Sequence, residues 1–134
     1  VLKLASIANA GYQKLRTSIR PGITERQIQL DYETAVSYAG SEKFPYDSIV
    51  GSGPNSAVLH AIPTARIVKD GEHVLIDAGA DLHDYCVDIT RCYPANGKRS
   101  ERFEAIYQIV RKAQEECISM CTPGTQWKDV HLKA

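Results

Sequence analysis

The chain has 134 residues, of which 43% are hydrophobic, and this is enough to build one domain around a modest core. Its 16 basic and 16 acidic residues cancel, so no net charge would attract nucleic acid or an anionic membrane surface. No apolar run approaches the length of a membrane span, so neither nucleic acid nor a membrane is an expected partner.

Two helices are predicted at the start of the chain, separated by a Pro-Gly turn. Residues 2–19 carry apolar side chains at helical spacing, and Pro21-Gly22 ends this pattern. Thr24, with Gln27 three residues later, forms a capping box that is typical of a helix start. The second helix is expected to run to about Ala39.

After these helices the pattern changes to strands. Residues 44–50 and 57–61 are β-prone segments joined by a connector rich in turn residues. Two further strands are predicted over 74–78 and 86–93, and the polar residues 79–84 between them predict a hairpin turn.

Two aspartates in this hairpin are the best clue to function, because an apolar, β-prone sequence would ordinarily not carry carboxylates. A turn centred on residues 82–83 would place Asp77 directly opposite Asp88, with Cβ atoms roughly 5 Å apart. Two like charges so placed repel, and a divalent cation such as Mn, Mg, Ca or Zn would offset the repulsion. The alternative is that one aspartate caps the turn and the other points to solvent.

A long helix is predicted from Ser100 to about Cys121, with Ser100 or Asn96 as its cap. A second Pro-Gly turn, Pro123-Gly124, is followed by another amphipathic segment, as Pro21-Gly22 is near the start. Apolar residues at helical spacing form a stripe that is expected to face the core: Phe103, Ile106, Tyr107, Val110, Ala113, Cys117 and Met120.

The order of helix, Pro-Gly turn, helix and strands predicts a repeat of roughly a hundred residues. A first unit would span about 1–98, and about 99–134 would open a second unit.

The cysteines and the other histidines carry less information. No signal-peptide pattern is present at the start of the sequence, so a reducing, cytoplasmic setting is expected, and the four cysteines fit this setting better than a disulfide framework. No CxxC zinc spacing exists, so the cysteines are expected to pack in the core: Cys86, Cys92, Cys117 and Cys121. Three histidines are expected at the surface: His73, His83 and His131.

Taken together, several short motifs resemble the pita-bread metallopeptidases that include Xaa-Pro aminopeptidases and Xaa-Pro dipeptidases (prolidases). Each motif is short, but their order and separations match jointly over nearly the whole chain. They are Pro21-Gly-Ile-Thr-Glu25, Ser48-Ile-Val-Gly-Ser-Gly53, Val58-Leu-His60, Val74-Leu-Ile-Asp-Ala-Gly79, Asp88-Ile-Thr-Arg91 and Pro94-Ala-Asn-Gly-Lys98. The resemblance implies an α+β fold in which helices pack on an antiparallel sheet, with this chain forming the first half of the pita-bread domain and the start of the second.

The resemblance implies a role for each matching residue. Asp77 matches an aspartate that chelates one metal ion of a dinuclear site, and Asp88 matches the aspartate that bridges both ions. His60 matches a catalytic histidine that contacts substrate and helps to stabilise the tetrahedral intermediate. Tyr46 matches a tyrosine that hydrogen-bonds the bridging carboxylate, and Thr90 shares a strand face with Asp88 and is placed to orient it.

The implied reaction is hydrolysis of a bond to proline at the N-terminus of a peptide or in a dipeptide. This bond has no N–H and resists general peptidases, so it needs its own pocket. Two divalent ions, Mn²⁺ or alternatively Zn²⁺ or Co²⁺, would bind a bridging water, lower its pKa and polarise the substrate carbonyl. The expected partners are proline-containing peptides, and whether the whole protein forms a homodimer stays open.

A complete family member supplies three more ligands, a histidine and two glutamates, and this sequence has no match for them. We therefore expect the 134-residue chain to be inactive by itself and the whole protein to be a peptidase. Ala61 stands where a tyrosine is common in relatives, which puts the details of the substrate pocket in doubt.

Three alternatives remain. Methionine aminopeptidases share the pita-bread fold, and His60-Ala-Ile-Pro63 resembles their corresponding segment, although their interval to the first metal aspartate is typically one residue longer. A non-catalytic pita-bread module that binds peptides or proteins would typically have lost its metal ligands. An unrelated α+β domain is the third alternative.

Overall fold

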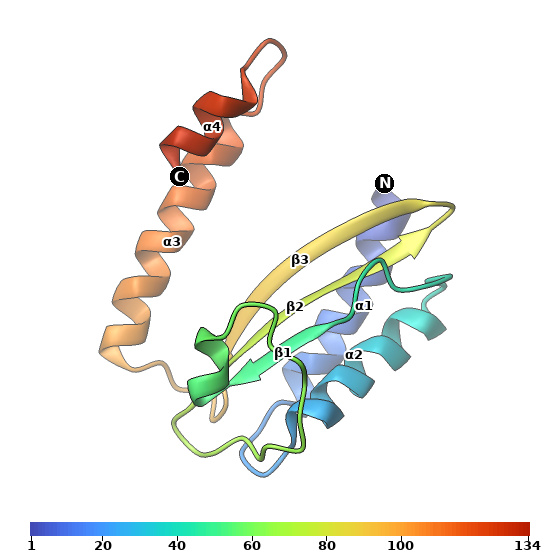
Figure 1. Ribbon diagram of the computed structural model, residues 1–134, viewed down its shortest axis with the longest axis vertical. Helices are drawn as coiled ribbons and strands as arrows, with labels where there is room; N and C mark the ends of the chain where they lie inside the picture. Colours follow the sequence, from blue (N-terminus) through green and yellow to red (C-terminus); the bar gives the residue numbers. More distant parts are fainter. The chain divides into compact units, whose positions relative to one another are not determined.

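The computed structural model describes all 134 residues, which divide into two compact units, Val1–Lys98 and Arg99–Ala134. The first unit contains two helices and a three-stranded sheet, and the second contains two helices (Figure 1). That the second unit opens a repeat of the first stays a prediction.

The two helices predicted at the start of the chain are confirmed. They are α1 (Leu2–Ser18) and α2 (Glu25–Tyr38). The capping box is formed as expected: the Gln27 N–H donates to Thr24 Oγ1 at 3.1 Å, and the Thr24 N–H donates to Gln27 Oε1 at 2.9 Å.

Two tyrosines join the helices to each other and to the sheet. The rings of Tyr12 on α1 and Tyr32 on α2 meet edge to face, with centroids 5.1 Å apart. The Tyr12 hydroxyl donates to the carbonyl of Ile89, and the Tyr32 hydroxyl donates to the carbonyl of Ala78 at 3.3 Å. Both carbonyls belong to long strands, so these buried polar groups fix the helix layer against the sheet.

The sheet consists of β1 (Ile49–Ser52), β2 (His73–Leu82) and β3 (Tyr85–Pro94), antiparallel and in this spatial order. Helices α1 and α2 cover one face, and within this unit no helix covers the other face (Figure 1). Alternate residues of β2 are buried under the helices: Val74, Ile76, Ala78 and Ala80. Asp77 therefore lies on the face away from the helices.

Two of the predicted strands are wrong in extent or in kind. Of residues 44–50, only the last two belong to β1, because the chain arrives there through Pro45, which cannot donate to a ladder. Residues 57–61 form no strand. The chain instead makes a short 3₁₀ helix, η1 (Gly53–Ala57), and then bends at His60, whose φ is +54°.

The hairpin is confirmed, but its predicted register is wrong. Its turn consists of two residues, His83 and Asp84, both with positive φ (56° and 62°), and the strands continue up to these residues. Thr90, and not Asp88, is therefore the partner of Asp77, and Asp88 lies opposite Gly79. Because the register differs by two residues, Asp77 and Asp88 still share one face of the sheet.

The second unit contains α3 (Glu101–Met120) and α4 (Trp127–Lys133), which pack against each other. Of the two candidate caps, Ser100 is the N-cap of α3, and its hydroxyl accepts the Phe103 N–H at 3.2 Å. The apolar stripe of α3 was expected to face a core, but no residue of this helix is buried, because only the seven-residue α4 packs against it within the unit.

The two Pro-Gly turns have the same geometry. Gly22 and Gly124 have φ values of 93° and 91°, which a residue with a side chain rarely adopts. Each turn is closed by a backbone hydrogen bond, from the Ile23 N–H to the Arg20 carbonyl in one and from the Thr125 N–H to the Thr122 carbonyl in the other.

The prediction that the cysteines pack in the core is wrong. All four are free thiols, and they are exposed or half-buried. Cys86 and Cys92 lie on the helix-free face of β3, since their partners on β2, Asp81 and Leu75, alternate with the residues that face α1 and α2. Among the histidines, His83 and His131 are exposed as expected, whereas His73 is half-buried and its burial lowers its pKa.

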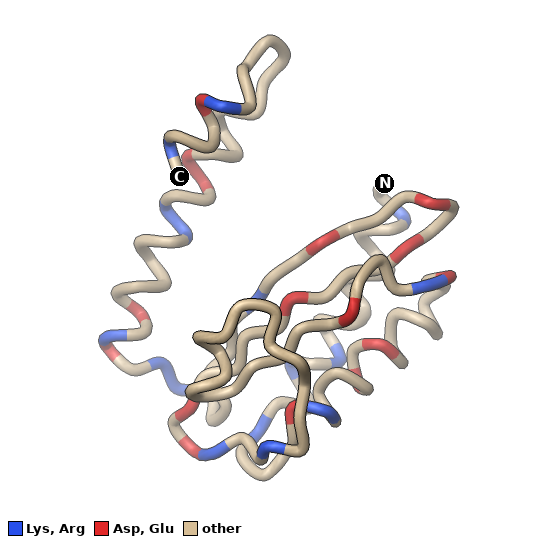
Figure 2. The backbone as a smooth tube through the Cα atoms, in the orientation of Figure 1, with Lys and Arg blue, Asp and Glu red and all other residues tan.

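Charge and hydropathy of the folded chain follow the composition. Basic and acidic residues are interspersed along the backbone of both units (Figure 2). No helix is both long enough and apolar enough to cross a membrane.

Candidate functional site

Four of the residues singled out from the sequence line one open pocket of about 700 Å³ in the first unit. Asp77 comes from β2 and Asp88 from β3. Tyr46 comes from the segment that precedes β1, and His60 from the segment that follows η1. The fold thus brings together side chains from four places in the sequence.

The Tyr46 hydroxyl joins the two aspartates. It lies 2.7 Å from Oδ1 of Asp77 and 2.9 Å from Oδ1 of Asp88. Burial raises the pKa of Tyr46 above its usual range, and the hydrogen bonds to the two carboxylates raise it further. The phenol therefore stays protonated at neutral pH and acts as a hydrogen-bond donor to both side chains.

Gly79 makes this arrangement sterically possible. A Cβ atom on Gly79 would lie 2.6 Å from Pro45 Cγ, 3.1 Å from Tyr46 Cε1 and 2.3 Å from the Val87 carbonyl oxygen. Only a residue without a side chain lets the Pro45-Tyr46 segment cross the sheet at this point. Sequence reasoning assigned Gly79 to a turn. Its place in the Val74-Leu-Ile-Asp-Ala-Gly79 motif was the available signal of a different role.

The charges of the two aspartates are incompletely compensated within this chain. A phenol has a single proton to share between two carboxylate oxygens, and neither aspartate forms an ion pair with Lys, Arg or His. Carboxylate oxygens on adjacent strands are donors that hard divalent cations prefer. The donor set therefore fits a divalent metal ion, which would offset the repulsion between Asp77 and Asp88.

The pocket supplies only part of a metal coordination shell. No group of three or more His, Cys, Asp or Glu side chains is arranged to hold a metal ion. Two carboxylates leave most positions of a six-coordinate ion to other ligands.

The structure places the remaining predicted residues in different relations to this pocket. His60 lines it and is exposed. Thr90 lies on the same face as Asp88 and opposite Asp77, but its side chain makes no hydrogen bond to either carboxylate. Arg26 and Gln29 of α2 also line the pocket, and no sequence signal pointed to them.

Comparison with known proteins agrees with this geometry. The model of metallopeptidase family M24 matches residues 1–134. A probable Xaa-Pro aminopeptidase of Emericella nidulans is 36% identical over 140 residues, covering 98% of this chain and 30% of that protein. The structure of the Pseudomonas aeruginosa aminopeptidase PepP superposes with a TM-score of 0.94 at 32% identity, over 98% of this chain and 30% of that one.

A prolidase from Pyrococcus furiosus is also similar, with a TM-score of 0.80 and 32% identity over 86% of this chain and 34% of that one. The chain therefore has the α+β, pita-bread architecture of these peptidases, as the sequence motifs implied. It spans only 24% to 30% of the length of the curated relatives that it matches.

Proposed function

Because the chain belongs to metallopeptidase family M24, we propose that the whole protein is a metal-dependent peptidase that hydrolyses Xaa-Pro bonds. Its substrates would be peptides with proline as the second residue, or Xaa-Pro dipeptides. The names of its relatives, probable Xaa-Pro aminopeptidases and prolidases, support this substrate class.

The observation that carries the proposal is the shared hydrogen bond at the floor of the pocket. Asp77 and Asp88 both reach the Tyr46 hydroxyl, in a pocket that His60 also lines. A cluster of two carboxylates with one shared proton is costly unless a cation joins it, and it is built here from neighbouring strands that hold the side chains in place.

In this proposal Asp77 and Asp88 would hold the divalent metal ions. Such a pair of ions would activate the attacking water and polarise the scissile carbonyl. Mn²⁺ suits the oxygen donors, with Zn²⁺ and Co²⁺ as alternatives. Tyr46 would keep Asp88 oriented by donating to its Oδ1.

His60 would act on the substrate and not on the metal. An imidazole at the pocket edge can donate a hydrogen bond to the oxygen on which negative charge develops during attack. Thr90 would help to orient Asp88 from the same face of the sheet. That the protein lies in the cytoplasm stays a prediction.

The proposal is tested by hydrolysis assays on the whole protein with and without Mn²⁺. We expect cleavage of Gly-Pro or of a longer Gly-Pro peptide, loss of that cleavage on chelation, and recovery on adding Mn²⁺. Asp88→Asn should lower the rate by at least about 100-fold, whereas Asp84→Asn, at the tip of the same hairpin, should not. A protein that cleaves methionyl peptides and not Xaa-Pro peptides would contradict the proposed specificity.

The 134-residue chain gives a separate test of the incomplete donor set. With only two carboxylates it should bind Mn²⁺ weakly and should not hydrolyse Gly-Pro. Metal-dependent hydrolysis by this chain alone would show that the further ligands are not needed.

A further inference from the structure

A buried carboxylate outside the candidate metal centre has no part in the proposed chemistry. Glu25, the first residue of α2, is fully buried, with 0% of its surface exposed. Burial raises the pKa of Glu25, but hydrogen bonds from Thr64 and Ser52 outweigh this and leave the pKa below its usual value. A buried ionised carboxylate needs a structural reason, because taking it out of water is costly.

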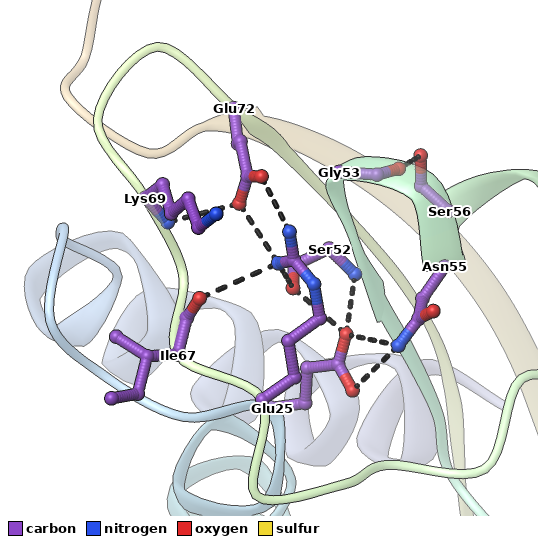
Figure 3. Close-up of polar contacts among 9 residues, drawn as sticks. Glu25, Ser52, Gly53, Asn55, Ser56, Ile67, Lys69 and Glu72 are labelled. Carbon is purple, nitrogen blue, oxygen red and sulfur yellow. Dashed lines mark hydrogen bonds and ion pairs between the residues drawn. The ribbon is translucent and has the colours of Figure 1, made fainter.

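The hydrogen bonds of Glu25 come from two separate parts of the chain. Oε1 accepts from the Ser52 N–H at 2.9 Å, from the Ser52 hydroxyl at 2.8 Å and from the Asn55 amide at 3.0 Å (Figure 3). Oε2 accepts from the Thr64 N–H at 3.1 Å and from the Thr64 hydroxyl at 2.6 Å. Oε2 also accepts from the Asn55 side-chain amide at 3.2 Å. Ser52 thus binds one oxygen, Thr64 binds the other, and Asn55 contacts both.

These two attachment points flank the segment that carries His60. Between Asn55 and Thr64 the chain has one backbone hydrogen bond, from the Val58 N–H to the Asn55 carbonyl. His60 itself has φ +54°, a conformation that a residue with a side chain adopts at a cost. A segment with so few internal bonds keeps such a conformation only if its ends are held, and Glu25 holds both.

The rest of this network stiffens the same attachment. The Arg66 guanidinium donates to the Ser52 hydroxyl at 2.6 Å and forms a bidentate ion pair with Glu72, with N–O distances of 2.5 and 2.8 Å. The Glu25 N–H also donates to the Arg66 carbonyl at 3.1 Å. The backbone of Glu25 therefore binds the chain two residues beyond Thr64, while its side chain binds Ser52, Asn55 and Thr64.

Helix capping does not explain the burial of Glu25. The N-terminus of α2 is capped by Thr24 and Gln27, which satisfy each other's backbone N–H groups. The Glu25 side chain makes its hydrogen bonds to residues outside the helix.

We infer that Glu25 is a positioning residue for His60. Its carboxylate holds the segment 53–63 at both ends and so places the imidazole in the pocket with Asp77 and Asp88. The catalytic consequence of this placement rests on the proposed function, and the placement itself does not.

The placement is tested by hydrogen exchange in the whole protein carrying Glu25→Gln. Glutamine has an NH₂ group in place of one carboxylate oxygen of Glu25. This NH₂ group cannot accept hydrogen bonds from the donors that now bind that oxygen, so one attachment point is lost. Amides in 53–64 should exchange at least about 10-fold faster than in the parent protein. Gln27→Ala is the matched control, because it breaks the capping box at the same helix end and should leave exchange in 53–64 unchanged.

If Glu25→Gln does not fold, Thr64→Val replaces it, since this variant removes only one hydroxyl from Oε2 and should loosen the same segment. Unchanged exchange in 53–64 in a folded Glu25→Gln or Thr64→Val protein would overturn the inference.

The catalytic consequence is tested by a double-mutant cycle on kcat for a Gly-Pro substrate. Glu25→Gln should lower kcat about 10-fold in the parent protein and should cause no further loss in a His60→Ala background. A full 10-fold loss in both backgrounds would show that Glu25 acts independently of His60 and would overturn the inference. If His60→Ala hydrolyses the substrate at the parent rate, the proposed role of His60 fails, and the exchange result alone decides the placement.

Discussion

At the scale of single residues, the central feature is one phenolic proton between two carboxylates. The Tyr46 hydroxyl can be reached by Asp77 and Asp88 together only because Gly79 leaves space for its ring. The phenol also keeps its proton, since burial and the two carboxylates raise the pKa of Tyr46. Tyr46 thus fixes the orientation of both candidate ligands before any cation arrives.

Replacing this hydroxyl should therefore weaken metal binding. We expect Tyr46→Phe to lower the Mn²⁺ affinity of the whole protein about 10-fold, because the carboxylates lose their common donor. Titration followed by electron paramagnetic resonance of free Mn²⁺ measures this affinity. Tyr85→Phe, which removes an exposed hydroxyl from the same hairpin, is the control, and an equal effect of both variants would contradict this role for Tyr46.

A second residue-scale prediction concerns the ion pair of Arg66 and Glu72. Hydrogen bonds from Arg66 lower the pKa of Glu72 to about 2 from an ordinary value of 4.5, and both side chains are mostly buried, with exposures of 22% and 18%. A carboxyl whose pKa is depressed by folding stabilises the protein above its unfolded pKa, and this contribution is lost as the pH falls through the folded value.

Glu72→Gln should accordingly reduce the free energy of unfolding by about 2 kcal/mol at pH 7. The difference between the parent and the variant should hold above pH 4.5 and shrink progressively as the pH falls toward 2. Urea unfolding at a series of pH values measures both quantities. Glu115→Gln, at an exposed ion pair with Arg111, should change little, and a pH-independent loss in Glu72→Gln would count against this explanation.

At the scale of elements, the two-residue turn at His83 and Asp84 sets the register of the hairpin. Both residues have positive φ, the backbone conformation of the tight turns that match the twist of antiparallel strands. This turn makes Asp77 and Asp88 diagonal neighbours on adjacent strands. Diagonal neighbours lie about 7–8 Å apart between Cα atoms, whereas the Cβ atoms of a directly opposed pair lie roughly 5 Å apart. The diagonal arrangement leaves room between the carboxylates.

The positive φ of Asp84 predicts that its glycine and alanine variants differ in stability. Glycine adopts positive φ without a steric cost and alanine does not, so Asp84→Gly should be more stable than Asp84→Ala by about 1 kcal/mol. Both variants lose the same exposed ion pair with Lys43, so it cancels in the comparison. Equal midpoints in thermal unfolding would show that the turn does not need this conformation.

Helices were predicted well because their signals are local. The Thr24-Gln27 capping box and the Pro21-Gly22 turn both lie within a few residues of the helix end that they define. The strands depend on partners far along the chain, so the extent of β1 and the register of β2 against β3 could not be read from spacing.

The candidate site shows the same limit. The sequence indicated Asp77, Asp88, Tyr46 and His60, and these four do line one pocket. Gly79 was assigned to a turn because residues 79–84 are polar, whereas this glycine lies in a strand and leaves space for the ring of Tyr46. The role of Glu25 depends on contacts with Ser52 and Thr64, which no local pattern reveals.

At the scale of the whole molecule, the chain is a part of the architecture seen in its relatives. It matches the metallopeptidase model over all its residues but spans only 24% to 30% of the curated relatives. No three of its His, Cys, Asp or Glu side chains are grouped so that they could hold a metal ion. We therefore propose that the activity belongs to the whole protein and that this chain contributes Asp77, Asp88 and His60 to it.

The central claim is that Asp77 and Asp88 bind the metal ions of a peptidase. Anomalous diffraction from crystals of the whole protein soaked in Mn²⁺ tests it most directly. We expect two manganese peaks in the pocket, in contact with the carboxylates of Asp77 and Asp88. Manganese bound only elsewhere, or a pocket without peaks at saturating Mn²⁺, would contradict it.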